Sequence, residues 1–150
     1  MFDATDVITI WNRYRDSETR REIWYRYVLP TLCKYKTKIV RAVNNAGAAK
    51  QTAQITNSQM VQIPFSSDIE SMYNEPRCWQ IQSDTERRVT FTLQPGDLVA
   101  LGEHSIEISG ETPHRLADVR AELGEHCFEI KSVQDNTRSR FGRHFKIEGV

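Results

Sequence analysis

Four histidines are the first residues in this chain whose side chains could support chemistry: His104, His114, His126 and His144. Two of them stand three residues before a glutamate, His104 before Glu107 and His126 before Glu129. Imidazole and carboxylate groups are common zinc ligands, but on a strand this spacing sends the two side chains to opposite faces. We therefore expect no shared metal ion at either pair, and no other cofactor.

The remaining reactive groups are scattered along the chain. Cys33, Cys78 and Cys127 lie far apart and form no C-x-x-C pair, which favours reduced thiols over disulfides or metal ligands. Acid pairs such as Asp68 and Glu70 occur, but nothing places two carboxylates across a cleft as a hydrolase requires. The chain also contains no G-x-S-x-G, P-loop, G-x-G-x-x-G or H-E-x-x-H motif. The sequence predicts a protein without catalytic activity.

Aromatic and basic residues are concentrated near the N-terminus, where the first 35 residues hold seven of the fourteen aromatics. A basic, aromatic β-surface is typical of an OB-type module that binds single-stranded nucleic acid. The other interpretation is that the aromatics form the core while the basic residues solvate the outer face. Both interpretations stay open, and the candidate nucleic-acid surface consists of Arg13, Arg26, Lys34, Lys36 and Lys38.

Two long, polar stretches, residues 44–58 and 134–143, have the composition of loops. Long loops in a compact domain are usually functional or disordered, and such loops could fold onto a neighbouring subunit during assembly. The second stretch is basic and could touch phosphate or an acidic neighbour. The candidate contacts to an oligomer partner or to DNA are Asn44, Asn45, Lys50, Asn136, Arg138 and Arg140.

Composition places the chain among ordinary globular domains. Its 150 residues include 39% hydrophobic and 27% charged residues, enough for one domain with a sizeable core. No apolar run approaches the roughly 20 residues of a membrane helix, and the first residues lack the apolar segment of a signal peptide. We therefore expect no membrane contact and a single β-rich domain over residues 1–150.

The formal net charge is zero, but the charges are separated along the chain. Residues 1–50 carry ten Lys/Arg and five Asp/Glu, a net charge of +5. Residues 51–130 carry five Lys/Arg and thirteen Asp/Glu, a net charge of −8. Residues 131–150 carry five Lys/Arg and two Asp/Glu, a net charge of +3. Fold geometry could mix these charges on one surface. Alternatively, faces of opposite sign meet in a head-to-tail oligomer, with the charges setting the register.

The elements that must position these residues begin with a predicted β-hairpin, DVITIWNRY and REIWYRYVL, because both flanks are rich in β-branched and aromatic residues. A four-residue loop at 16–19 would place Trp11 opposite Trp24 and Arg13 opposite Glu22. Further strands are predicted over residues 32–43, 59–65, 89–93, 98–108, 127–133 and 143–150. The last two would form a closing hairpin.

Between these strands, QPGD (94–97) has the residues of a type II turn. Residues 66–88 read as a loop anchored by Trp79. One helix is predicted over TPHRLADVRAELG (112–124), with Thr112 as N-cap, Pro113 at the first helical position and Gly124 as the stop. The expected fold is mainly β, a small barrel or sandwich of about seven short strands with one α-helix (112–123) and long loops.

Three stretches resemble minor structural proteins of tailed phages and prophages: DVITIWNRYRDSETRREIWYRYVLP, FTLQPGDLVALGE and VQDNTRSRFGRHFKIEGV. The first is similar to their opening strand pair, the second to a strand–turn–strand with a PGD turn, and the third to their closing segment. Residues 44–88 have no counterpart in these phage proteins. The helix predicted at 112–124 resembles theirs only in being a helix, not in its residues.

The resemblance implies a non-catalytic virion component, present in the host cytoplasm during assembly. Its place would be the neck, where head-completion or stopper proteins are small β-barrels that form rings between the portal and the tail. A minor capsid or tail-completion protein is the neighbouring possibility. The expected partners are further copies of the chain in a ring, portal or adaptor proteins, tail proteins and, through the loops, packaged DNA.

Overall fold

The structure, a computed structural model, describes residues 4–45 and 51–150, with the side chains of those residues outside 39–57. Within these residues the strands are β1 (Ile8–Arg15), β2 (Glu22–Val28), β3 (Lys34–Asn45), β4 (Gln51–Pro64), β5 (Leu98–Leu101), β6 (Cys127–Asn136) and β7 (His144–Gly149). The helices are α1 (Ser67–Met72), α2 (Pro76–Gln80), α3 (Asp84–Val89) and α4 (Leu116–Leu123).

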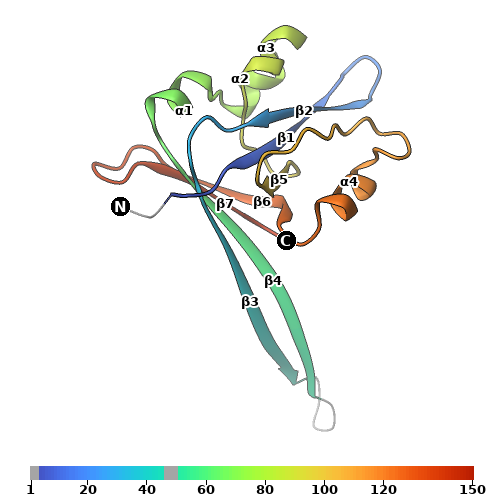
Figure 1. The fold of residues 1–150 in the computed structure, drawn as a ribbon, viewed down its shortest axis with the longest axis vertical. Helices are drawn as coiled ribbons and strands as arrows, with labels where there is room; N and C mark the ends of the chain where they lie inside the picture. The colour runs from blue at the N-terminus through green and yellow to red at the C-terminus, as the bar shows by residue number, and fades with distance from the viewer. Residues whose placement is uncertain (1–3, 46–50) are drawn as a thin grey trace.

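The strands form one antiparallel sheet in the order β2-β1-β5-β6-β7-β4-β3 (Figure 1). β6 belongs to both halves of this sheet, because residues 127–129 pair with β5 and residues 130–136 pair with β7. The register shifts between Ile130 and Ser132, and such a bulge bends a strand. The sheet is not closed into a barrel, and its arrangement is sandwich-like. The expectation of a mainly β fold is confirmed.

The larger core lies inside the curved sheet. β1, β4, β6 and β7 each contribute fully buried side chains there, and Ile69 of α1 closes one end. Burial of each large apolar side chain contributes about 1.5–3 kcal/mol. The alternation of apolar and polar residues predicted for the closing hairpin is confirmed, since Phe145 and Ile147 are buried between half-buried neighbours. This core holds the sheet together around the bend at β6.

A second core covers the outer face of the same sheet. Trp11 and Trp24 pack there with Val119 of α4, and the Trp11 indole N–H donates to the carbonyl of Ile106 at 3.0 Å. The apolar stripe predicted for the helix is confirmed, because Leu116 and Leu123 pack against this core beside Val119. β1 and β5 are therefore covered on both faces.

The predicted N-terminal hairpin is confirmed, but its register is wrong by two residues. Trp11 lies opposite Arg26 and Arg13 opposite Trp24, because the loop spans six residues, 16–21, rather than four. Arg20 has a left-handed φ of 56° and its N–H donates to the carbonyl of Asp16. A shift of two residues keeps every side chain on its predicted face.

The region predicted as a loop anchored by Trp79 contains three short helices instead. The Ser66 hydroxyl accepts from the N–H of Ile69, and the Ser83 hydroxyl from the N–H of Glu86, which are ordinary N-caps. Trp79 is fully buried on α2 as the expected anchor. The strand predicted at 89–93 is wrong, since Val89 ends α3 and Phe91 makes one isolated bridge to Tyr73.

Two boundaries also differ from prediction. The strand predicted over 98–108 ends at Leu101, where Gly102 follows with a φ of 95°. The predicted helix begins at Leu116 rather than after Thr112, because the carboxylate that caps its first turn is Asp118, which accepts from the N–H of Arg115 at 3.1 Å. Its stop at Gly124, with a φ of 78°, is confirmed.

The turn at QPGD is confirmed too, with Gly96 at φ 97° and the N–H of Asp97 donating to the Gln94 carbonyl at 3.3 Å.

The predicted loop at 44–58 is mostly strand. β3 and β4 pair from Lys34 and Gln62 to Asn45 and Gln51, whereas β7 pairs with β4 only over residues 59–64. Residues 38–45 and 51–58, here called the arm, therefore have only each other as sheet neighbours among the described residues. Figure 1 shows the arm standing away from the rest of the molecule, the body.

Candidate functional site

The predicted contact residues lie in two separate places. Asn44 and Asn45 are the last residues of β3, in the arm, with Thr52 and Gln51 as their register partners. Lys50 lies outside the described residues. Asn136 is the last residue of β6, and Arg138 and Arg140 lie in the turn before β7. The structure does not bring the two predicted groups together.

The lysines of the alternative nucleic-acid surface form a row at the edge of the sheet. Lys34, Lys36 and Lys38 alternate along β3, and β3 is an edge strand. Lys36 and Lys38 are exposed and Lys34 is half-buried. None of the three forms an ion pair within the described residues. The predicted solvated, basic face of this strand is confirmed.

The two arginines of that surface lie elsewhere and carry partners. The Arg13 guanidinium is 3.6 Å from the Glu22 carboxylate. Arg26 donates to Glu107 at 2.9 Å and to the carbonyl of His104 at 3.1 Å. Both pairs are partly exposed and stabilise the fold by at most about 1 kcal/mol each. Neither arginine continues the lysine row.

Three aromatics of the N-terminal hairpin, Trp11, Trp24 and Tyr25, are covered by the fold and cannot act as a stacking platform. Trp11 is fully buried, and Trp24 and Tyr25 are more than nine-tenths buried. The Tyr25 ring packs edge-on against Trp79 at 5.6 Å, and its hydroxyl donates to Asp84 at 2.6 Å. Bases cannot stack on rings that are covered in this way. Of the two interpretations of these aromatics, the structure supports the core.

The turn between β6 and β7 presents a basic surface with one exposed aromatic ring. Arg138, Arg140 and Arg143 are exposed, and 84% of Phe141 is accessible to solvent. The Arg140 guanidinium lies 5.8 Å from the centre of the Phe141 ring. We call these four residues the basic tip. The sequence predicted contacts at Arg138 and Arg140 but not at Arg143 or Phe141, although a single phenylalanine within RSRFGR, a polar turn, was a readable signal.

A pocket of about 280 Å³ opens beside α4 and carries the opposite charge. Its charged side chains are Glu103 and Glu122, its apolar ones Ile106 and Leu123, and His104 and Ser105 complete the lining. Both glutamates are exposed and form no ion pair within the described residues. The sequence suggested His104 only as a metal ligand beside Glu107 and gave no reason to connect it with Glu103 or Glu122. We call this the α4 pocket.

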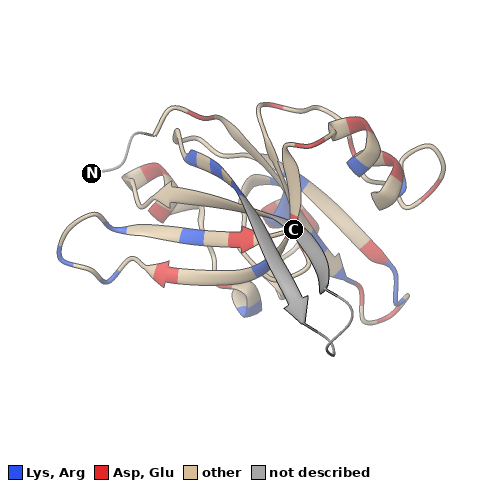
Figure 2. Cartoon of the chain, turned by 90° about the horizontal axis from the view of Figure 1, so that it is seen from below, with Lys and Arg blue, Asp and Glu red and all other residues tan. Residues whose placement is uncertain are grey.

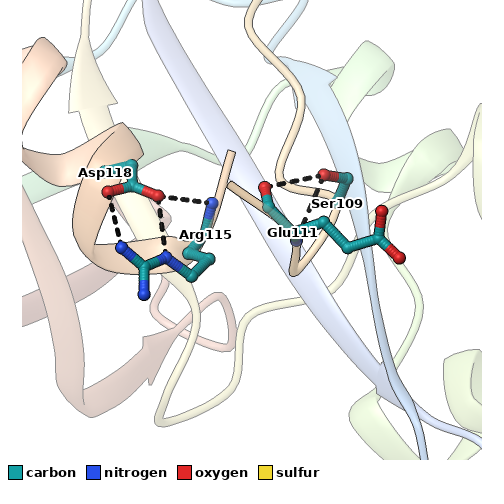
Figure 3. A network of polar contacts seen from close by, with 4 residues as sticks. All are labelled: Ser109, Glu111, Arg115 and Asp118. Atoms are coloured by element: carbon teal, nitrogen blue, oxygen red, sulfur yellow. Dashed lines mark hydrogen bonds and ion pairs between the residues drawn. The ribbon is translucent and has the colours of Figure 1, made fainter. Parts of the chain in front are cut away.

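A wider groove of about 610 Å³ lies between β2 and the segment that leads into α4. Arg115 at its edge is held by Asp118, with nitrogen–oxygen distances of 3.0 and 3.3 Å (Figure 3). The hydrogen bond to Arg115 lowers the pKa of the Asp118 carboxyl. The Ser109 hydroxyl contacts the backbone of Glu111 in the same segment. These contacts fix the start of α4 rather than supply free polar groups.

The most perturbed carboxyl group of the described residues is that of Asp97, which is fully buried. Burial raises its pKa to about 7. Three N–H donors oppose this rise: Asn12 at 2.7 Å, the backbone of Arg13 at 2.9 Å and Gln94 at 2.9 Å. All of them belong to the contact between β1 and the 94–97 turn. Asp97 therefore serves to join these two segments.

The histidine and cysteine candidates form no site in the described residues. No group of three or more His, Cys, Asp or Glu side chains is placed there to hold a metal ion. The described cysteines are free, with Cys33 and Cys127 buried and Cys78 exposed. Burial raises the pKa of the Cys33 thiol to about 12, which keeps it protonated and unreactive at neutral pH.

None of the helices in the described residues is long and apolar enough to span a membrane.

Comparison with known proteins identifies the family of the chain. No curated protein and no solved structure is significantly similar to the chain. A protein-family model described as "Family of unknown function (DUF6751)" matches residues 3–150, almost the whole sequence. The chain thus belongs to the DUF6751 family.

Proposed function

We propose that the chain is a non-catalytic structural subunit of a tailed-phage or prophage particle. It acts as a head–tail connector subunit that assembles into a ring and contacts portal or adaptor and tail proteins. The resemblance of three stretches of the sequence to phage structural proteins suggests the particle. The observation that carries the assembly role is the arm.

The arm needs a partner for physical reasons. Residues 38–45 and 51–58 form a two-stranded ribbon whose other edges have no sheet neighbour in the described residues. An isolated two-stranded ribbon is marginally stable in water, and its outer edges present unpaired N–H and C=O groups. A neighbouring chain can satisfy these groups by adding a strand. Such a contact between successive copies is one way to build a ring.

The charge of this part of the chain supports the same role. From Ile23 to Ser67 the sequence contains no Asp or Glu, while β3 carries Lys34, Lys36, Lys38 and Arg41. The residues from Asp68 to Glu129 hold all thirteen acidic residues of the segment 51–130. A basic hairpin and an acidic remainder attract each other between copies.

The test is the molar mass of the purified full chain over a concentration series, by light scattering with negative-stain images. Lys38 and Ser58 are register partners, so residues 39–57 can be replaced by Asn-Gly, a favoured two-residue hairpin turn. We expect the wild type to approach the mass of one ring and the trimmed variant to stay monomeric. A wild type that is monomeric throughout, and does not bind a phage portal ring, would contradict the proposal.

Binding of nucleic acid is the second candidate, in the form of a contact to packaged DNA. The exposed lysine row on β3 favours it, whereas the burial of Trp11, Trp24 and Tyr25 leaves no platform for an OB-like mode. Phosphate contacts weaken steeply with salt. Fluorescence anisotropy with duplex and single-stranded DNA at several salt concentrations tests this contact, and absence of binding at low salt removes it.

A further inference from the structure

The basic tip has the composition of a binding determinant rather than of an ordinary turn. Phe141 is 84% exposed, and three arginines surround it within six residues. Aromatic residues and arginine are the types most enriched among residues that dominate binding energies. Arg138 and Arg140 form no ion pair within the described residues, so their charges are available to a partner.

The α4 pocket is complementary to this tip in charge. Glu103 and Glu122 supply two exposed carboxylates to a mostly polar pocket, and the half-buried Ile106 and Leu123 complete its wall. Nearby bases do not neutralise these glutamates, because Arg115 is paired with Asp118 and Arg120 donates to the carbonyl of Val150 at 3.2 Å. Between Gly102 and Glu125 the sequence has six acidic residues and two arginines.

The two surfaces lie on opposite sides of the body. In Figure 1 the turn between β6 and β7 lies at the left end and α4 at the right, and Figure 2, from below, shows the same separation. The tip of one copy therefore cannot reach the pocket of the same copy. A contact between two different surfaces of successive copies is heterologous, and it closes into a ring when the rotation between copies allows.

We propose that the basic tip of one copy docks in the α4 pocket of the next copy. In this contact Phe141 packs against Ile106 and Leu123, and Arg138 and Arg140 lie beside Glu103 and Glu122. The proposal rests on ring assembly as the proposed function and names a second contact, separate from the arm, that joins the copies.

Charge reversal on each side of the contact provides the test, using the full chain. Arg140→Glu and Glu122→Arg each place like charges together, and we expect each to weaken self-association about tenfold or more by light scattering. Phe141→Ala should weaken it about 10- to 30-fold. Arg77→Glu is the matched control, since Arg77 is exposed on α2, and Figure 1 shows α2 apart from both α4 and the turn between β6 and β7. It should leave association unchanged.

Mixing the two reversed variants gives the decisive measurement. In an equimolar mixture every tip can meet a pocket of opposite charge on the other variant, so association should recover to within about threefold of the wild type. Thermal unfolding of each variant, compared with the wild type, establishes that the exposed substitutions leave the fold intact.

The outcomes separate this proposal from the proposed function. If the reversed variants assemble like the wild type while the arm-trimmed variant does not, the docking contact is overturned and ring assembly stands. A wild type that never associates overturns both. If Arg138→Glu and Arg140→Glu abolish binding to short DNA duplexes but leave association unchanged, the tip binds DNA and the docking proposal is wrong.

Discussion

The body and the arm are built from the same antiparallel pairing, yet they differ in what supports it. In the body, β1 and β5 have neighbours on both edges and a core on both faces. In the arm, each strand has one neighbour along residues 38–45 and 51–58. Stability should therefore depend on the close packing of the body, and the arm should serve association. The predictions that follow test this division.

The largest effect on stability is expected at Gly149, where an added Cβ would meet the backbone of the neighbouring strand. Gly149 is buried and pairs with both Gln59 and Ile130. A Cβ at this position would lie 1.9 Å from the carbonyl oxygen of Glu129, so the sheet would have to separate. We expect Gly149→Ala to lower the free energy of unfolding by more than about 4 kcal/mol, or to prevent folding.

Urea denaturation of Gly149→Ala beside Gly110→Ala measures this effect. Gly110 has a left-handed φ of 81° but no atom within 4 Å of its added Cβ, so its substitution costs only the backbone strain, about 1–2 kcal/mol. Equal losses in the two variants would show that close packing at Gly149 is not what holds β6, β7 and β4 together.

The second effect concerns the buried carboxyl group of Asp97. Its folded pKa of about 7 lies above its usual value of 3.8. The folded protein therefore binds a proton more tightly than the unfolded chain between these pH values. The contribution of Asp97 to stability is fully present below about pH 4 and is lost as the pH rises through 7. We expect a loss of about 2–4 kcal/mol across this window.

Urea denaturation between pH 4 and pH 8 checks this prediction, with Asp97→Asn as the control. An amide does not titrate, so the variant should lose the slope between pH 4 and pH 7, while the exposed carboxyls keep their own effect below pH 4. Identical slopes in the two proteins would show that Asp97 is ionised in the fold throughout.

The sequence predicted the parts of the body whose local signals agree with their packing. The QPGD turn, the stop at Gly124 and the closing hairpin are confirmed, because glycine at positive φ and a period of two are strong local signals. The predicted hairpin register was wrong by two residues because the left-handed conformation of Arg20 extends the loop. Glycine and asparagine commonly adopt this conformation, whereas an arginine in the sequence gives no sign of it.

The missed elements are those whose pattern is weak or short. Helices α1 to α3 have five or six residues, too few for a helical period to emerge, although Ser83 before Glu86 was a readable capping box. Residues 51–58 are mostly small or polar, and their strand follows from pairing with β3 rather than from their own propensity. For the site, the basic turn was predicted, but the α4 pocket joins Glu103 and Glu122, which only the tertiary fold brings together.

The smallest effect on stability is expected from removing the arm. Replacing residues 39–57 by Asn-Gly keeps the paired residues Lys38 and Ser58 and every strand pair of the body. Because no strand of the body pairs with the arm among the described residues, and Figure 1 shows the arm standing away from the body, the free energy of unfolding of the monomer should change by less than about 0.5 kcal/mol. Urea denaturation at a concentration where the wild type is monomeric measures this. A loss of several kcal/mol would mean that the arm is part of the folding unit and stabilises the monomer without any partner. An unchanged free energy of unfolding combined with lost assembly would assign the arm to association alone.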